Sequence, residues 1–300
     1  RGVKRLSLGW QHPLYLLPFD HRAAFTQMAQ DVGLAKRLVY DGFLAAVNSI
    51  DANYAGILVD EEAGKEILKD ASKAGYITAC PAEKSGEAEF QFEYGEKFSM
   101  HLDAMGVQFV KVLVRYNPEG DTALNERQAL RLAKLSLDCD QSGRKMMFEL
   151  LVPSSDAQLA SVSGDRKRYD LEVRPGLTVR AMRELLSAGV EPDIWKLEGV
   201  EDPKAFDSFV AVARSPGGAR SRAEVGIIIL GRGESLETVK IWMKACAGRP
   251  GAKGIAVGRT LWEEPVRAYE SGRMAREAAA GEIAKRFMDL CAFWKVLSSS

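Results

Sequence analysis

Short apolar runs alternate with longer amphipathic stretches along the chain. The short runs are rich in Val, Ile and Leu, whereas the longer stretches repeat their apolar positions about every 3.6 residues, and loops separate the two. This alternation predicts β-strands that are each followed by an α-helix, as in a parallel sheet built from βα units. The predicted strands span residues 14–19, 55–59, 76–80, 109–114, 145–151, 193–197, 225–230 and 254–257.

The predicted helices follow these strands. They span residues 34–50, 63–74, 90–105, 124–142, 177–188, 203–214, 236–247 and 261–271, with a last helix over 274–297. Eight βα units in 300 residues predict one α/β domain, a single (β/α)8 TIM barrel, because this fold typically needs about 250 residues. Within the domain 1–300, residues 13–272 would form the barrel and residues 274–297 a C-terminal helix. An open, doubly wound sheet is the alternative, but no GxGxxG motif follows the first predicted strand.

One connection is much longer than the others. Residues 152–176 form a polar segment between the fifth strand and its helix. Long connections in compact domains usually act as lids or binding loops, or carry a short helix of their own. Because this segment leaves the carboxyl end of a strand, where TIM-barrel enzymes keep their chemistry, we expect it to be a lid.

The charge composition is balanced. The chain has 41 Lys and Arg against 41 Asp and Glu, which excludes binding to nucleic acid or anionic membranes through bulk charge. No apolar run is long enough to cross a bilayer, and the N-terminus lacks a signal-peptide core. The four cysteines have no metal-binding spacing, which predicts reduced thiols. We therefore expect a cytoplasmic protein with no nucleic-acid or membrane partner.

Charged residues lie in or directly after all eight predicted strands. Barrel strands are normally apolar, so charges at their carboxyl ends need an explanation. In TIM barrels this end holds the catalytic residues. In strand order the charged residues are Asp20; Asp60 and Glu61; Glu83 and Lys84; Lys111 and Arg115; Glu149; Lys196 and Glu198; Arg232; and Arg259.

Lys196 lies inside the sixth predicted strand, where a buried ammonium must be paired or neutral. Desolvation, or a neighbouring cation such as Lys111, would lower the pKa of Lys196 and leave a free amine able to attack a carbonyl. Glu149, on the preceding strand, is placed to exchange protons with a carbinolamine or a substrate hydroxyl. The alternative is that Lys196 and Glu149 form only a structural ion pair.

Glycines and arginines follow the last two strands. In many TIM barrels these loops bind phosphate through backbone N–H groups and a helix N-terminus. Glycine permits a close backbone approach, and arginine offers a bidentate fork to a phosphoryl group. The sequence therefore predicts a phosphate site here, with further substrate contacts from the third and fourth strand ends. The candidate residues are Gly231, Arg232, Gly233, Gly258 and Arg259, with Arg115 and Lys84.

The histidines do not form a metal-binding pattern. The three of them are too few and too dispersed for a three-histidine zinc site. Asp60, Glu149 and Glu198 could still hold Mg2+ by carboxylates alone. We therefore predict no metal and no cofactor, with a carboxylate-held Mg2+ as the alternative.

Several motifs span nearly the whole chain and are specific when taken together. They are LPFDHR (17–22), GILVDEE (56–62), EKSG (83–86), KVLVRYNP (111–118), FELLVP (148–153), RP (174–175), WKLEG (195–199), LGRG (230–233) and VGRT (257–260). Together, these motifs resemble a known family, the aldolase-like barrel of myo-inositol catabolism (DUF2090). In bacteria this barrel forms the C-terminal half of 5-dehydro-2-deoxygluconokinase proteins. The chain is more distantly similar to class I tagatose-bisphosphate aldolases.

The resemblance implies a class I aldolase site. Lys196 would be the Schiff-base lysine and Glu149 the general acid/base, while Asp20 and Lys111 would contact the substrate. Arg259 and the glycine–arginine turn over 231–233 would bind phosphate. The implied reaction is cleavage of 6-phospho-5-dehydro-2-deoxy-D-gluconate to dihydroxyacetone phosphate and malonate semialdehyde. Tagatose-type aldolases have a small turn in place of LGRG, so the extra arginine suits an acid carboxylate better than a second phosphate.

Two other functions stay open from the sequence. The barrel could be a non-catalytic docking or regulatory module for a PfkB-type 5-dehydro-2-deoxygluconokinase, or it could be a Mg2+-dependent aldolase. No PfkB-like GAGD turn occurs in these residues. A kinase partner would therefore be another domain or a neighbouring chain. The expected small-molecule partner is a phosphorylated sugar acid, and a homo-oligomer is possible.

Overall fold

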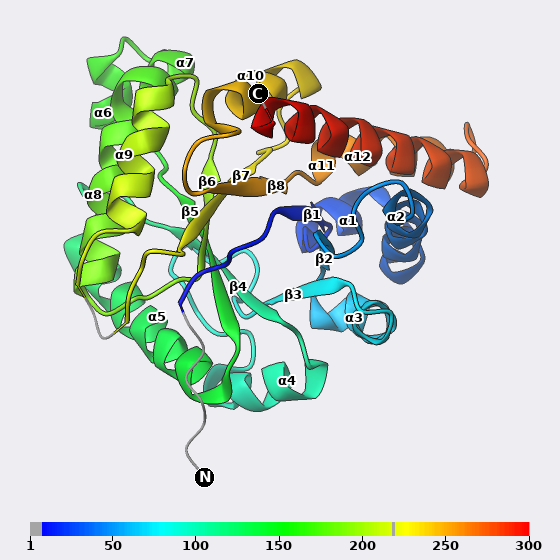
Figure 1. Ribbon diagram of the computed structural model, residues 1–300, viewed down its shortest axis with the longest axis horizontal. Helices are drawn as coiled ribbons and strands as arrows, with labels where there is room; N and C mark the ends of the chain where they lie inside the picture. The colour runs from blue at the N-terminus through cyan, green and yellow to red at the C-terminus, as the bar shows by residue number, and fades with distance from the viewer. Residues whose placement is uncertain (1–7, 218–219, 300) are drawn as a thin grey trace.

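Eight parallel strands close into a barrel in the computed structural model, which describes residues 8–217 and 220–299 (Figure 1). The strands pair in chain order, and the last pairs with the first. The predicted TIM barrel is therefore confirmed, and each predicted strand begins and ends within two residues of an observed one. The strands are β1 (Leu14–Pro18), β2 (Ala55–Leu58), β3 (Ile77–Pro81), β4 (Phe109–Arg115), β5 (Lys145–Leu151), β6 (Ile194–Glu198), β7 (Gly226–Leu230) and β8 (Ala252–Ala256).

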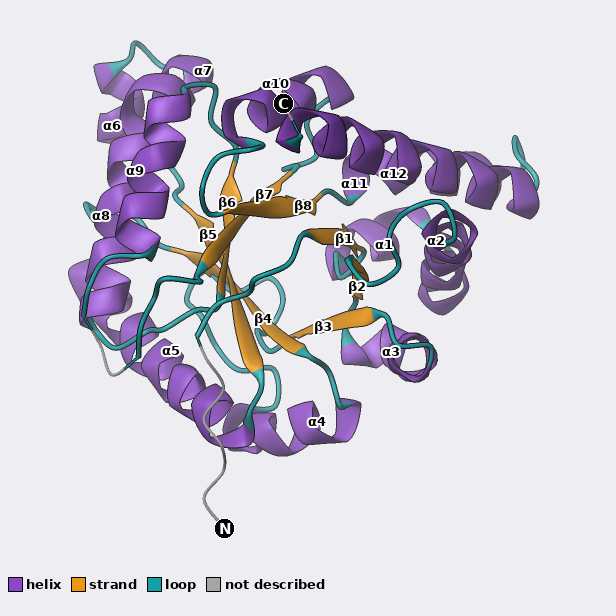
Figure 2. Ribbon diagram, viewed as in Figure 1, coloured by secondary structure: helices purple, strands orange, loops and turns teal. Residues whose placement is uncertain are grey.

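Helices surround the barrel (Figure 2). In the described chain they are α1 (Arg22–Met28), α2 (Val32–Val47), α3 (Glu61–Lys73), α4 (Phe98–Met105), α5 (Thr122–Ser142), α6 (Asp156–Ser161), α7 (Arg166–Arg168), α8 (Arg174–Ser187), α9 (Pro203–Ala213), α10 (Leu236–Cys246), α11 (Arg259–Glu270) and α12 (Arg276–Ser298). A 3-10 turn, η1 (Gly95–Lys97), and a π-helical turn, η2 (Tyr169–Val173), complete the set. None of the described helices has the length and apolar character that a membrane span requires.

Two stretches differ from the sequence prediction. Helix α1 was not predicted, and the helix expected from residue 90 begins only at Phe98. Residues 83–93 instead form a short antiparallel connection, with a bridge between Glu83 and Phe92. Phe90 is buried there, and its N–H donates to the Gln128 side chain (2.8 Å). Tertiary contacts of this kind override a helical pattern.

The barrel interior has an apolar floor. Alternate residues of each strand face the barrel axis, and apolar inward residues pack as one cluster, with Trp10 packed against it. Its members are Leu14, Leu16, Leu58, Ile77, Ala79, Phe109, Met147, Ile194, Ile228 and Ala256. The charged residues predicted at the strand ends therefore lie above this floor, at the carboxyl end of the barrel.

The barrel closes where β8 pairs with β1. At Gly254 a Cβ atom would lie 1.9 Å from the main-chain oxygen of Leu14, so only glycine allows β8 to approach β1. Outside this seam α12 packs against α2 (Figure 1). Gly42 makes room for Ile283, since a Cβ atom there would lie 2.7 Å from the Ile283 side chain. Arg276 pairs with Asp41 at 2.6 Å.

The long connection after β5 is folded. It contains α6, α7 and η2 and leads directly into α8. Ser155 and Gln158 form a reciprocal capping box at the start of α6. The hydroxyl of Tyr169 donates to the main-chain oxygen of Val152 (2.9 Å), which fastens the far end of the segment to the end of β5. We call residues 152–173 the β5–α8 segment.

Asp193 lies at the amino end of β6 and holds neighbouring segments together there. Asp193→Ala should lower the free energy of unfolding by about 2–4 kcal/mol. This buried carboxylate accepts hydrogen bonds from the N–H groups of Gly9 (2.9 Å) and Met146 (2.8 Å), which would lose their acceptor. Urea denaturation measures the change. The control, Asp207→Ala, removes an exposed carboxylate paired with Arg249 and should change stability by under about 0.5 kcal/mol. Equal effects of the two substitutions would contradict this role of Asp193.

Candidate active site

Two lysines and three carboxylates meet above the apolar floor, and we call these five residues the lysine cluster. Lys111 Nζ lies 2.9 Å from Asp20, 2.6 Å from Glu83 and 3.0 Å from Glu149. Glu149 Oε2 also accepts from Lys196 Nζ at 2.8 Å. One glutamate oxygen therefore bridges the two ammonium groups.

The strand pattern explains why these side chains converge. Lys111 is two residues beyond the floor residue Phe109, and Glu149 is two residues beyond Met147, so both face the barrel axis. Glu149 on β5 and Lys196 on β6 are directly paired in the strand register. The sequence prediction that Asp20, Lys111, Glu149 and Lys196 share one end of the barrel agrees with this arrangement.

The cluster is largely removed from water. Lys111, Lys196 and Glu149 are 1%, 2% and 7% exposed. Burial acts to lower the pKa of Lys111, but its three carboxylate neighbours outweigh burial and raise that pKa well above its ordinary value. Burial acts to raise the pKa values of Asp20 and Glu149, but the neighbouring ammonium groups outweigh it and lower both. Lys111, Asp20 and Glu149 are therefore charged at neutral pH.

Two residues of this site were not among the predicted catalytic residues. Glu83 belongs to the lysine cluster, and burial, its largest influence, raises the pKa of this carboxyl. His21 follows Asp20 directly; its Nδ1 lies 3.6 Å from Asp20 Oδ1, and burial lowers the pKa of its imidazole to about 4. The sequence signal for Glu83 was a carboxylate just after a strand, and for His21 its place beside Asp20 in the LPFDHR motif.

The glycine–arginine loops after β7 and β8 lie against each other. Gly233 has a positive φ of 74°, and a Cβ atom there would lie 2.7 Å from Arg259 Nη2. Arg259 Nη2 donates to the main-chain oxygen of Arg232 (3.0 Å), and its buried Nε has no partner in the described chain. Arg259 is also the first residue of α11, so its N–H lies at a helix N-terminus after Gly258. This geometry suits an anion.

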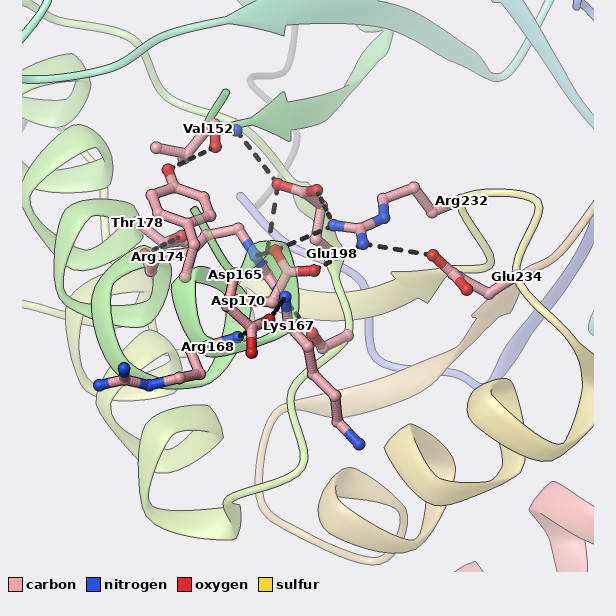
Figure 3. Close-up of polar contacts among 12 residues, drawn as sticks. Val152, Asp165, Lys167, Arg168, Asp170, Arg174, Thr178, Glu198, Arg232 and Glu234 are labelled. Carbon is pink, nitrogen blue, oxygen red and sulfur yellow. Dashed lines mark hydrogen bonds and ion pairs between the residues drawn. The ribbon is translucent and has the colours of Figure 1, made fainter. Parts of the chain in front are cut away.

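Arg232 is surrounded by carboxylates (Figure 3). Its guanidinium pairs with Asp170 at 2.6 Å, Glu198 at 3.1 Å and Glu234 at 3.2 Å. Asp170 belongs to η2 and Glu198 to β6, so Arg232 ties the β5–α8 segment to the barrel. The sequence predicts that Arg232 binds phosphate, but three carboxylates already pair with its side chain.

A cavity of about 320 Å3 opens beside this ion-pair group. Arg115, Arg166, Ser154 and Glu198 are among its lining residues. Arg115 is exposed, and its contact with the Glu87 main-chain oxygen is long at 3.5 Å. Glu198 is two residues beyond Lys196 on β6, so the cavity lies above the lysine cluster on the same side of the barrel mouth.

Lys84 does not join these groups. Its side chain is 53% exposed and pairs with Glu87 at 3.1 Å in the connection after β3.

The three carboxylates that the sequence suggests as Mg2+ ligands lie apart from one another. Asp60 pairs with Lys36, Glu149 with the two lysines, and Glu198 with Arg232. Within residues 8–217 and 220–299, no three His, Cys, Asp or Glu side chains are grouped to hold a metal ion.

The geometry of the lysine cluster suits chemistry at a carbonyl. Lys196 is a primary amine, and Glu149, in contact with it, is a carboxylate that can accept a proton. Lys111 places a permanent positive charge beside the same carboxylate, which can stabilise negative charge that develops on an oxygen. The floor beneath excludes water on one side and strengthens these interactions.

Comparisons with known proteins give one family and one fold. Residues 6–298 match a family described as "Uncharacterized protein conserved in bacteria (DUF2090)". A search for curated relatives found no match. A fructose-bisphosphate aldolase from Plasmodium falciparum, solved with TRAP and a small-molecule inhibitor, is similar with a TM-score of 0.68 and 14% identity over 95% of this chain and 91% of that one. A Schiff-base-forming fructose-1,6-bisphosphate aldolase has a TM-score of 0.56 and 17% identity over 93% and 94%. At these identities the likeness concerns the fold.

Proposed function

This chain belongs to the DUF2090 family, and we propose that it is a class I aldolase, a carbon–carbon lyase that works through an imine on Lys196. The proposed reaction is cleavage of 6-phospho-5-dehydro-2-deoxy-D-gluconate to dihydroxyacetone phosphate and malonate semialdehyde. The observation that carries the proposal is the buried pair of lysines joined by Glu149 Oε2, at 2.8 Å and 3.0 Å. The shared fold with the two aldolase structures supports it.

Lys196 is the better nucleophile of the two lysines. Three carboxylates hold Lys111 as an ammonium ion, and an ammonium ion has no lone pair with which to attack. Lys196 has one carboxylate partner, Glu149, in the described chain. Transfer of one proton to that partner frees the Lys196 amine.

The reaction then follows from the groups in contact. The Lys196 amine adds to the substrate ketone, and loss of water gives an iminium ion that withdraws electrons. Glu149 gives the proton that it took from Lys196 to the oxygen that departs as this water and is again a carboxylate. It then takes the proton of the hydroxyl on the β carbon, the bond between the α and β carbons breaks, and the aldehyde leaves. The enamine that remains on Lys196 takes up a proton at carbon, and hydrolysis releases the ketone product.

The polar groups around the lysine cluster support a substrate with two anionic ends. Arg259, Gly233 and the start of α11 suit the phosphate. Arg115 and Arg166 line the cavity above the lysine cluster and suit a carboxylate. The phosphate implies a kinase that supplies the substrate, on this polypeptide or a neighbouring one.

Borohydride trapping tests the proposed function. The protein is incubated with dihydroxyacetone phosphate, reduced, and mapped by mass spectrometry. We expect one adduct, on Lys196, and retro-aldol turnover of the proposed substrate that survives EDTA. Absence of an adduct together with loss of turnover in EDTA would support the metal-dependent alternative instead. Absence of both adduct and turnover would favour a docking module.

Arg259→Ala should weaken the binding of a phosphorylated substrate by about 1.5–3 kcal/mol, which is the contribution of a hydrogen bond to a charged group. The measurement compares kcat/KM for the phosphorylated and dephosphorylated substrates in both enzymes, and the variant should lose most of the wild-type preference for phosphate. Arg267→Ala, an exposed arginine in the same helix that pairs with Glu263, is the control and should change neither value. An equal loss with both substrates would mean that Arg259 only supports the loops.

A further inference from the structure

Lys111 sits among more carboxylates than the lysine cluster can balance. Asp20, Glu83 and Glu149 all lie within 3.0 Å of its Nζ. With Lys196 the cluster has two ammonium groups and three carboxyl groups, so full ionisation leaves one uncompensated negative charge. Burying such a charge is costly, and carboxylates that share one site avoid it when one of them keeps its proton.

The position of the proton follows from the hydrogen bonds. Among the described carboxylate oxygens of the lysine cluster, Glu83 Oε2 alone is both buried and without a hydrogen-bond partner. Glu83 Oε1 accepts from Lys111 at 2.6 Å, while Oε2 is buried and has no donor in the described chain. An ionised oxygen without a donor is far less stable than a hydroxyl in the same place. Glu83 Oε2 is therefore the atom that holds the proton.

No second cation compensates Glu83. Arg22, on α1, donates to the main-chain oxygen of Glu83 (2.9 Å) and pairs through Nη1 with Glu93. Asp60, after β2, is paired with Lys36. Lys111 is therefore the sole cation within 4 Å of the Glu83 carboxylate among the described residues. Burial raises the pKa of Glu83, in agreement with this arrangement.

From this geometry we infer that Glu83 is a neutral carboxylic acid in the resting enzyme and the general acid that completes the imine. This inference rests on the proposed function. When the Lys196 amine has added to the ketone, the O–H of Glu83 gives its proton to the carbinolamine hydroxyl, the C–O bond breaks, and water leaves as the C=N bond forms. Glu83 is left as a carboxylate and regains a proton when water adds back during hydrolysis. Glu83 and Glu149 thus divide the acid and base roles according to their protonation states.

Infrared spectroscopy of the free protein tests the protonation state. At neutral pH the wild type should show the carbonyl stretch of a buried carboxylic acid, and Glu83→Gln should lack it. Glu96→Gln, which changes an exposed carboxylate paired with Lys134, should retain it. Absence of the band in the wild type, or its persistence in Glu83→Gln, overturns the inference. Absence of the band in the wild type overturns the inference whether or not the variant folds.

The kinetics of imine formation test the role of Glu83 as the general acid. Gln imitates the neutral acid in shape, so Glu83→Gln should fold, but it cannot donate a proton. Borohydride quenching at successive times should show the Lys196 adduct forming about 10²-fold more slowly or worse, with the same final yield. The alkaline fall in the wild-type rate, caused by loss of the Glu83 proton, should vanish in the variant. A wild-type rate in Glu83→Gln overturns the acid role. A wild type that forms no adduct refutes the proposed function and with it the acid step, while the infrared result still decides the protonation state.

Discussion

Lys196→Met should reduce kcat by roughly 10⁴-fold or more and remove the borohydride adduct, since the imine has no other route if Lys196 is the nucleophile. Met has a similar length and sits well in an apolar strand. Glu149 keeps Lys111 as a partner at 3.0 Å. Turnover of the phosphorylated sugar acid and mass mapping after reduction measure the two effects, and the melting temperature checks the fold.

The control for this variant changes a lysine outside the barrel. Lys204, exposed on α9, can be changed to Met without touching the lysine cluster, and Lys204→Met should keep both activity and adduct. An undiminished adduct in Lys196→Met would refute Lys196 as the nucleophile. Lys111 would then be the next candidate, although its three carboxylates argue against it.

Glu149→Gln should lower kcat by about 10²-fold to 10⁴-fold, the range lost with a general acid or base. Gln keeps the size of the side chain and one acceptor oxygen, but it cannot take the proton from the substrate hydroxyl. The adduct with dihydroxyacetone phosphate should still form in this variant, because the nucleophile is intact. Steady-state kinetics and trapping in the same preparations separate the two steps.

A purely structural role of Glu149 would give a different result in the same experiments. Glu149 joins two ammonium groups, so a purely structural carboxylate would reveal itself as a lower melting temperature with unchanged kcat. Glu184→Gln is the control, because Glu184 is a hydrogen-bonded carboxylate outside the barrel interior, which accepts from the Tyr116 hydroxyl at 2.9 Å. A loss of kcat in both variants would point to a general loss of fold rather than to lost chemistry.

The barrel could be predicted because its strands and helices have different periods. Charged residues interrupt or directly follow the apolar strands, and these positions identified Asp20, Lys111, Glu149 and Lys196. A period of two then places Lys111 and Glu149 on the inner face of their strands. The same period places Lys196 on the inner face of β6, so local pattern leads to Lys196 and Glu149, the two residues that carry the proposed chemistry.

Side-chain partners could not be predicted in the same way. Arg232 has the residue type and the loop that suit phosphate, but its three carboxylate partners come from η2, β6 and its own loop. Two of these partners are distant in sequence. Glu83 presents the same difficulty, because its proton depends on how many carboxylates surround Lys111, which only the folded barrel determines.

The seam between β1 and β8 matters for how the protein is made. A ribosome releases β1 and α2 long before β8 and α12 exist, so the nascent chain has one open edge on β1 and an α2 surface that lacks its α12 partner. Unpaired strand edges and uncovered apolar surfaces promote aggregation during synthesis. The nascent barrel therefore stays prone to aggregation until α12 has left the exit tunnel. A chain that stops before α12 would remain prone to aggregation.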